Sequence, residues 1–343
     1  MQPTLRDVAD KVGVSAATVS MVLRGRADGR ASAETQARIR DTARELNYVS
    51  NGHAASLRTK KTPTVGFISD RIATTPHAVE IIRAASEAAR TFEHTLLMVN
   101  TGELPSTELT AVRELRRDGI ESVIYASMQH RRVTLPEGLP ENLVIVDGFA
   151  DDHAVPATVP DEAGGVVAAV HHLVDLGHRR IGFLNEDPAR AIAAELRLEG
   201  YRKALEERGI AVDPDLIEES RNEPGVSDAG VAKLLERARP TAIVCFNDEM
   251  ATGVYREAGR RGLSIPEDLS VVGFDNLELV ATLVDPPLTT VRLPHAEMGE
   301  WAIRMLLDER YRDSATTAPG PVLQPAPLVI RSSTGPPGAS MRP

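Results

Sequence analysis

The sequence from Thr4 to Arg24 reads TLRDVADKVGVSAATVSMVLR and predicts two short helices joined by a tight turn. Thr4 and Asp7 have the spacing of a capping box, so the first helix is expected to begin there. Apolar side chains then recur at helical spacing as far as Gly13, which tolerates the positive φ of a sharp turn. Ser15 is suited to cap a second helix, which carries its own apolar stripe.

The outer face of the second predicted helix has only small or polar side chains and one cation at its end. These side chains are Ala16, Ala17, Thr18, Ser20, Met21 and Arg24. A helix with such a face can enter the major groove of DNA, which is typical of a helix-turn-helix. A three-helix core with no DNA role is the alternative. It accounts for the apolar stripe but not for the Ala-Ala-Thr face beside many arginines.

These residues resemble the LacI family of bacterial transcription regulators. The family's T-x-x-D-V-A start stands at 4–9, its G-V-S turn at 13–15 and its T-V-S at 18–20. The sequence departs from the family at Met21 and at Arg24, where a polar or basic residue and Asn are usual. Met21 offers only apolar contact, for instance with a thymine methyl, so the family's operator sequences do not carry over. The resemblance and the outer face together predict DNA contacts from Thr4, Ser15, Ala16, Ala17, Thr18, Ser20, Met21 and Arg24, and the loop that follows adds Arg30, with a solvated position as its alternative.

Residues 50–62 resemble the family's hinge segment, which in relatives forms a short helix on operator DNA. Leu57 stands where relatives drive a leucine into the minor groove, and Arg58 follows where a basic residue is usual. Asn51 and Ala54 complete the predicted contacts of this segment. An apolar wedge between base steps kinks DNA and reads its deformability. A plain polar linker is the alternative.

Charge is divided unevenly along the 343 residues, whose net charge is −10. Residues 1–62 hold 11 lysines and arginines against 6 acidic residues, a net charge of +5, so the rest of the chain carries −15. A basic head on an acidic body is typical of a DNA-binding module joined to a soluble one. The single Cys245 permits no intrachain disulfide, and neither a signal peptide nor a membrane-spanning run is visible. We therefore expect a cytoplasmic protein without membrane contact.

From Thr64 onward, short apolar runs alternate with helical stretches, which predicts parallel sheets with right-handed crossovers. The runs lie at 65–68, 96–99, 123–125, 143–146, 181–184, 242–246 and 271–274. Further family signatures extend the resemblance over nearly the whole chain, at 176–182, 197–201, 247–251, 272–276 and 288–291. The resemblance implies an α/β fold: a two-lobed, periplasmic-binding-protein-like body of two doubly wound parallel sheets, preceded by a small all-α helix-turn-helix domain.

The expected domains follow from these segments. A helix-turn-helix domain covers 1–49, a hinge 50–62, an effector-binding and dimerisation domain 63–333, and a disordered Pro/Gly/Ser-rich tail 334–343. The amino-terminal lobe is expected to combine about 63–160 with 291–322, and the carboxyl-terminal lobe about 161–290 with 323–333.

Carboxylate or amide groups follow six predicted strands, at the end where open α/β sheets bind ligands. Such groups suit a polyhydroxylated ligand such as a sugar or nucleoside. Turn formation and helix capping are the alternative, and Asp248 in particular is expected to be a cap. The predicted effector site combines strand-end groups with positions that the resemblance implies: Asp70, Asp147, Arg190, Arg197, Asn247 and Asp275. Phe149 and Trp301 are candidates to stack on the ligand, with structural roles as the alternative.

Other chemistry is sparse. His171, His172 and His178 have a spacing that fits no closed metal site, and we expect them at the surface. The sequence has neither a Gly-rich phosphate loop of the Gly-Lys-Ser/Thr type nor a nucleophile elbow. We therefore predict no enzyme, no metal and no cofactor.

The sequence as a whole predicts a DNA-binding repressor, a homodimer or tetramer. Its partners are expected to be double-stranded operator DNA and a small polar effector, a carbohydrate or a derivative of one, held between the lobes. Two alternatives stay open. One is a small-molecule-binding protein of the periplasmic type without a DNA role, and the other is a regulator that responds to a nucleoside or nucleobase.

Overall fold

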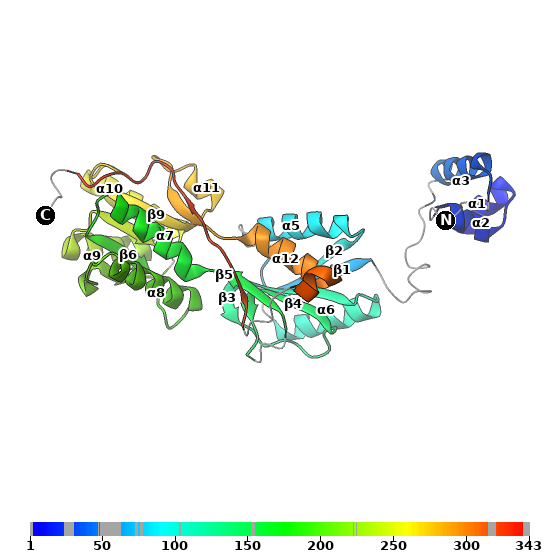
Figure 1. The fold of residues 1–343 in the computed structure, drawn as a ribbon, viewed down its shortest axis with the longest axis horizontal. Coiled ribbons are helices and arrows are strands. Elements are labelled where there is room, and N and C mark those ends of the chain that lie inside the picture. The colour runs from blue at the N-terminus through cyan, green and yellow to red at the C-terminus, as the bar shows by residue number, and fades with distance from the viewer. Residues whose placement is uncertain are drawn as a thin grey trace. The chain divides into compact units, whose positions relative to one another are not determined.

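The computed structural model of the chain contains two separate units, residues 1–62 and 63–343. It describes residues 3–23, 31–46, 48, 63–72, 75, 78–102, 104–151, 155–221, 223, 225–314 and 320–338. The elements are labelled in Figure 1.

The amino-terminal unit is a head of three helices, α1 (Leu5–Val12), α2 (Ala16–Leu23) and α3 (Ala33–Glu45). The predicted capping box is present, because the Asp7 side chain accepts a hydrogen bond from the backbone N–H of Thr4 at 2.6 Å and Thr4 Oγ1 accepts from Asp7 N–H. Gly13 ends α1 with a φ of 78°, and Ser15 Oγ accepts from the backbone N–H of Thr18 at 3.1 Å. The helices enclose a small apolar core formed by Val8, Ala9, Val12, Val19, Val22, Ile39 and Ala43. The predicted helix-turn-helix is thus confirmed.

The first lobe of the body is built on a six-stranded sheet of order β11-β5-β4-β3-β1-β2, in which all pairs are parallel. Its strands are β1 (Thr64–Ser69), β2 (Thr95–Asn100), β3 (Ser122–Arg132), β4 (Asn142–Phe149), β5 (Ala157–Pro160) and β11 (Val322–Gln324). Helices α5 (Ala78–Thr91) and α12 (His295–Leu307) lie side by side on one face, and α6 (Pro105–Arg117) covers the other (Figure 1). A short helix, α13 (Glu309–Ser314), follows α12.

The second lobe repeats this plan with the order β12-β10-β9-β8-β6-β7, where only the β10–β12 pair is antiparallel among the described strands. Its strands are β6 (Ile181–Asn185), β7 (Ile217–Glu219), β8 (Ala242–Cys245), β9 (Ser270–Asp275), β10 (Thr289–Arg292) and β12 (Leu328–Val329). Helices α7 (Glu162–Asp175) and α8 (Ile192–Glu207) cover one face, and α9 (Val226–Ala238) and α10 (Asp248–Arg261) the other. The short elements η1 (Pro214–Leu216) and α11 (Glu278–Ala281) complete the lobe.

The chain passes between the lobes at three places, from β5 to α7, from β10 to α12 and from β11 to β12 (Figure 1). The two-lobed, doubly wound fold is therefore confirmed. The predicted lobe boundaries at 291 and 323 each fall inside a strand, β10 and β11 respectively. These strands, like β5, β7 and β12, are too short to be recognised in the sequence from a run of apolar residues.

Two expectations about the carboxyl-terminal lobe need correction. The predicted disordered tail begins too early, because Thr334 bonds to His172 Nε2 at 2.9 Å and the Gly335 carbonyl to His178 Nε2 at 2.8 Å. His178 is also not at the surface: it is 1% exposed, and its Nδ1 lies 2.8 Å from Thr241 Oγ1. This histidine fastens the terminal segment to the lobe. Burial lowers the pKa of His178, which agrees with a neutral, structural imidazole.

In the part of the chain that the structure describes, no helix has the length and apolar character needed to cross a membrane.

Candidate functional site

The face of α2 predicted to read DNA is open to solvent. Ala16 and Ala17 are exposed and Thr18 is partly so, while Val19 and Val22 point inward and are at most 1% exposed. Ser20 and Met21 are also partly exposed, and Thr4 and Ser15, which cap the two helices, are exposed. The head therefore presents a convex helix with short side chains, a shape that fits a major groove.

The other predicted DNA contacts lie outside the described residues. They are Arg24 and Arg30 of the head and Asn51, Ala54, Leu57 and Arg58 of the hinge. Their roles stay predictions from the sequence.

A cleft of about 800 Å³ opens in the body and takes its lining from both lobes. Most of its polar side chains lie at or just beyond the carboxyl ends of strands, as expected for an α/β sheet. It contains five of the six predicted effector residues, namely Asp147, Arg190, Arg197, Asn247 and Asp275. The sequence thus predicted five residues that line one cleft, and their contacts with an effector stay a prediction.

Arg197 is the central cation of the cleft and is 4% exposed. Its Nε donates to Glu162 Oε2 at 2.7 Å, its Nη1 donates to the Phe246 carbonyl, and its Nη2 lies 3.6 Å from Asp275 Oδ1. The guanidinium also contacts two aromatic rings, with Cζ 3.6 Å from the centroid of Phe274 and 4.4 Å from that of Phe246. These contacts fix its position before any ligand arrives.

Close packing of α7 against α8 makes the Arg197–Glu162 pair possible. A Cβ at Gly200 would lie 2.5 Å from the Ala163 carbonyl oxygen, so only glycine allows the two helices this approach. Arg197 lies one turn before Gly200 on α8, and Glu162 is the first residue of α7. Although burial alone would raise the pKa of Glu162, Arg197 and His130 hold that pKa below its usual value, so Glu162 is ionised.

Asp147 and Asp275 face the cleft from opposite lobes in strained backbone conformations. Asp147, in β4, has a φ of 56°, and Asp275, the last residue of β9, has a φ of 99°. A positive φ is unusual for a residue with a Cβ, and such strain clusters at ligand-binding sites. Burial raises the pKa of both carboxyl groups well above the usual value, with Glu162 adding to the effect at Asp147 and Arg197 opposing it at Asp275.

Asn247 and Asp248 both line the cleft, but the helix cap expected of Asp248 is supplied by Asn247. Asn247 is the N-cap of α10, since its Oδ1 accepts from the backbone N–H of Met250 at 2.8 Å. Asp248 is not a cap: its Oδ1 accepts from Thr290 Oγ1 at 2.5 Å and its Oδ2 from the backbone N–H of Leu277 at 2.6 Å. Asp248 therefore ties the start of α10 to β10 and to the turn before α11. Burial raises its pKa to about 7, although both hydrogen bonds oppose the shift.

An Asp248→Asn protein is expected to lose part of the pH dependence of folding. Because the folded pKa of Asp248 is about 7 against a usual 3.8, the folded state holds a proton that the unfolded state releases, so stability falls as pH rises between these values. The loss is roughly 2 kcal/mol between pH 5 and 7, at about 1.4 kcal/mol per pKa unit, because the slope weakens as the pH reaches the folded pKa. Urea unfolding of both proteins at the two pH values measures this, and identical pH dependence in the variant would contradict it.

Asp70 is the predicted effector residue that does not line the cleft. It follows β1, is 5% exposed, and its Oδ2 accepts from Arg131 Nη2 at 2.9 Å. Arg131 itself lines the cleft. Asp70 therefore holds a cleft arginine in place.

Glu162, His130 and Phe246 are among the cleft residues that were not predicted from the sequence. His130 Nδ1 lies 3.6 Å from Glu162 Oε1 at the junction of the lobes. The aromatic candidates are corrected too: Trp301 is in the core of the first lobe, and Phe149 packs edge-on against His130 outside the lining. Among the described residues no group of His, Cys, Asp or Glu side chains is arranged to hold a metal ion.

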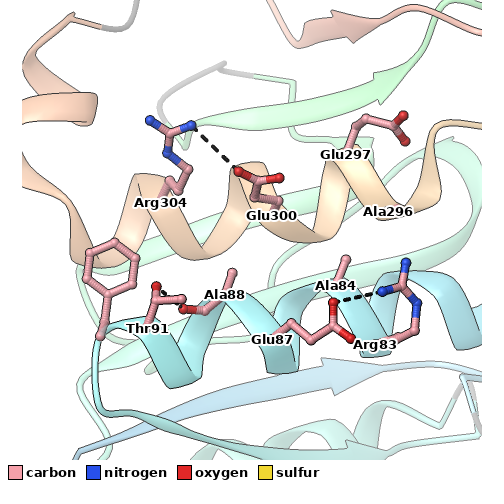
Figure 2. A pocket seen from close by; sticks show the side chains of 10 residues that line it. Arg83, Ala84, Glu87, Ala88, Thr91, Ala296, Glu297, Glu300 and Arg304 are labelled. Carbon is pink, nitrogen blue, oxygen red and sulfur yellow. Dashed lines mark hydrogen bonds and ion pairs between the residues drawn. The ribbon is translucent and has the colours of Figure 1, made fainter.

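A second hollow, of about 520 Å³, lies between α5 and α12 (Figure 2). Arg83 pairs with Glu87 at 2.7 Å and Arg304 with Glu300 at 3.6 Å, each along its own helix (Figure 2), and Glu297 pairs with Arg292 of β10 at 2.6 Å. Arg304 also covers the ring of Tyr311 at 4.0 Å. Since these charges are exposed and mutually satisfied, the cleft between the lobes is the better candidate for a ligand site.

Comparisons with known proteins match the head and the body of the chain. The model for the lacI family of bacterial regulatory proteins matches residues 4–51, and a periplasmic binding protein-like domain matches residues 170–334. The chain is 32% identical to the HTH-type transcriptional regulator DegA of Bacillus subtilis (strain 168), over 98% of this chain and 99% of that protein.

Two solved structures are similar over almost the full length. The lac repressor dimer bound to operator and the anti-inducer ONPF has a TM-score of 0.76 and 26% identity, covering 98% of this chain and 100% of that one. The complex of the transcriptional regulator CelR with cellobiose has a TM-score of 0.65 and 27% identity, covering 96% and 99%. With its helix-turn-helix head, its two-lobed body and these relatives, the chain belongs to the lacI family of bacterial regulatory proteins, and it is a DNA-binding transcription regulator.

Proposed function

We propose that the chain is a homodimeric repressor whose affinity for double-stranded operator DNA is set by a sugar or sugar derivative bound in the cleft. The observation that carries this proposal is the pair of strained carboxylates, Asp147 and Asp275, that face one cleft from two different lobes. A ligand that bridges them favours the closed body. Only such a difference in ligand affinity between two body conformations can shift the DNA-binding equilibrium.

The chemistry of the cleft supports a polyhydroxylated ligand. Carboxylates accept hydrogen bonds from hydroxyl groups, and the side chains of Asn247 and Arg190 add further polar contacts. The cellobiose complex of the similar regulator CelR points to the same class of ligand. We place the protein in the cytoplasm, where its operator DNA lies.

Apolar side chains that stand out from each lobe support a homodimer. β2 is the edge strand of the first sheet, and its Leu97 and Met98 are 42% and 48% exposed. In the second lobe, Leu279 of α11 and Leu283 are 72% and 75% exposed. Exposed apolar groups on an edge strand mark a surface that another chain covers, and the similar lac repressor is a dimer.

A Met98→Glu, Leu283→Glu double variant is expected to be monomeric and to bind operator far more weakly, because one head alone reads only one half-site. Analytical ultracentrifugation with an operator titration measures both effects. Leu323→Glu is the matched control, since Leu323 is 59% exposed on β11 at the opposite edge of the sheet. A double variant that stays dimeric would assign the dimer contact to another surface.

The proposed function is tested by measuring ligand binding to the cleft and DNA binding by the head on the same protein. A thermal-shift screen of sugars and nucleosides on the full-length chain identifies ligands, and a gel shift on DNA upstream of its own gene finds the operator. We expect a sugar that raises the melting temperature to change the gel shift as well. If ligands stabilise the body but none changes DNA binding, the cleft does not control the head.

A further inference from the structure

The reading face of α2, which we define as the side chains of Ala16, Ala17, Ser20 and Met21, has no group that reads a base through a pair of hydrogen bonds. Arginine and lysine read guanine in this way, asparagine and glutamine read adenine, and carboxylates accept from cytosine. None of these residue types occurs anywhere in α2, from Ala16 to Leu23. A helix of this composition in a major groove has to discriminate between bases by other chemistry.

The hydroxyl groups at the start of α2 supply little sequence information. Ser15 Oγ and Thr18 Oγ1 lie 2.8 Å apart and bond to each other, and Ser15 Oγ also accepts from the backbone N–H of Thr18 at 3.1 Å. These two hydroxyls therefore serve the helix cap. A hydroxyl can both donate and accept, so it pairs with the edge of any base, and Ser20 adds affinity with little discrimination.

The reading face does present a strip of apolar carbon. Ala16 and Ala17 expose their methyl groups, and Met21 is partly exposed. Ala17 and Met21 are four residues apart, so they lie one above the other on the same side of the helix. The short alanines let the helix backbone approach the base edges, and the long, flexible methionine reaches further along them.

Thymine is the base that matches such a strip. Its C5 methyl is an apolar group at the edge of the major groove, where guanine and adenine present hydrogen-bonding atoms. Burial of one methyl-sized group against carbon changes affinity roughly four-fold. A guanine or adenine at the same place would instead press polar edge atoms against carbon and lose their hydration without replacement.

The cations of the described head lie on its other two helices. Arg6 and Lys11 belong to α1, and Arg38, Arg40 and Arg44 belong to α3. Such side chains are suited to phosphates, which fix the position of a protein on DNA without reading its sequence. Within the described part of the head, attraction to phosphate and contact with base edges are thus assigned to different helices.

We propose that α2 selects its operator through the 5-methyl groups of thymines, which Ala16, Ala17 and Met21 contact in the major groove, with Met21 as a specificity-determining residue. The inference deepens the proposed function, because it rests on α2 as the helix that reads the operator. It names the chemical group on the DNA that this helix recognises, and it does not depend on the identity of the cleft ligand.

Thymine methyl groups can be removed one at a time from a duplex that the full-length chain binds. The probe is a duplex that this chain selects from a random library, in which each thymine in turn is replaced by deoxyuridine, a base that lacks only the 5-methyl group. We expect the replacement at one or more half-site positions to weaken binding roughly four-fold per methyl lost, measured by fluorescence anisotropy at one salt concentration. If every deoxyuridine duplex binds as tightly as the parent duplex, the inference is overturned.

Variants of Met21 test whether α2 makes these contacts. Met21→Gln keeps the length of the side chain but replaces the thioether by an amide, so it is expected to lose the preference for thymine over uracil at one or more of the sensitive positions. Met21→Leu keeps an apolar side chain and should retain part of that preference. Neither variant should change the salt dependence of binding, because Met21 neutralises no phosphate. The same thymine preference in Met21→Gln as in the wild-type protein at every position overturns the role of Met21.

Arg40→Ala is the matched control within the head. Arg40 is exposed on α3, where its Nη2 donates to Gln36 Oε1 at 3.4 Å. Its removal should leave the ratio of affinities for the thymine and uracil duplexes unchanged, whatever it does to the binding of DNA in general. A change in this ratio as large as that in Met21→Gln would contradict the assignment of the preference to Met21.

This inference and the proposed function fail in different ways. A protein that prefers thymine to uracil but binds operator equally with and without cleft ligands supports methyl recognition and contradicts control by ligand. A protein whose operator affinity responds to a cleft ligand but is indifferent to every deoxyuridine supports the proposed function and overturns methyl recognition.

Discussion

An Ala17→Glu protein is expected to lose specific operator binding while its body still binds ligand. Ala17 is exposed on the outer face of α2, where it has the small side chain that a helix needs deep in a major groove. A glutamate there adds bulk and sets a negative charge against phosphates, so the affinity should fall roughly a hundred-fold or more, toward the level of nonspecific DNA. Fluorescence anisotropy with operator and random duplexes at one fixed salt concentration measures both affinities.

The matched control for this variant is Ala37→Glu. Ala37 is exposed on α3, so the change adds the same side chain and the same charge to the head. The control should retain most of the preference for operator over random DNA. Operator binding of Ala17→Glu at the wild-type level would mean that α2 is not the recognition helix.

Replacement of Arg197 by alanine is expected to abolish the ligand response and to destabilise the body. The change leaves the ionised Glu162 buried without its 2.7 Å partner, and breaking such a pair costs about 3–5 kcal/mol. It also removes the cation that lies 3.6 Å from Asp275 Oδ1. Urea unfolding gives the loss of stability, and an operator titration with and without ligand gives the response. Arg202→Ala, at an exposed position of the same helix, is the control and should change neither.

Because Arg197→Ala is expected to destabilise the body, Asp275→Asn tests the same site with a smaller effect on folding. Asparagine has the size of aspartate and tolerates the left-handed backbone that Asp275 adopts at φ 99°. The variant should fold, bind operator in the absence of ligand and lose affinity for ligand by roughly ten-fold or more, as expected when a hydrogen-bonding carboxyl group of the site is removed. A full response at the same ligand concentration would remove Asp275 from the site.

Local signals made the head predictable from sequence. The capping box at Thr4 and Asp7, the turn at Gly13 and the cap at Ser15 each involve residues within a few positions of one another. Helix capping and periodicity operate on that scale, so the sequence contains the whole of the information. The same holds for Asp275, the last residue of β9, because the apolar run at 271–274 marks where that strand stops. The run at 143–146 ends just before Asp147, although β4 itself continues to Phe149.

Contacts between distant segments were not predictable in this way. Glu162 is read from the sequence as an acid in the first turn of a helix, and its partner Arg197 is 35 residues away along the chain. His178 follows a glycine in a polar stretch, which indicates a surface, yet Thr241 and Gly335 bury it. His130 stands among polar residues at the end of β3, and only the packing of the lobes brings it beside Glu162. Tertiary packing decides these environments.

The most direct test of the account is the operator affinity of the full-length chain with and without a saturating cleft ligand. The wild-type protein and Asp275→Asn are compared at one salt concentration and one ligand concentration. We expect ligand to change the operator Kd of the wild-type protein by about ten-fold or more, within the usual range of coupling between two sites, and to leave that of Asp275→Asn nearly unchanged. A wild-type operator Kd that is the same with and without every ligand found to bind the cleft would contradict it.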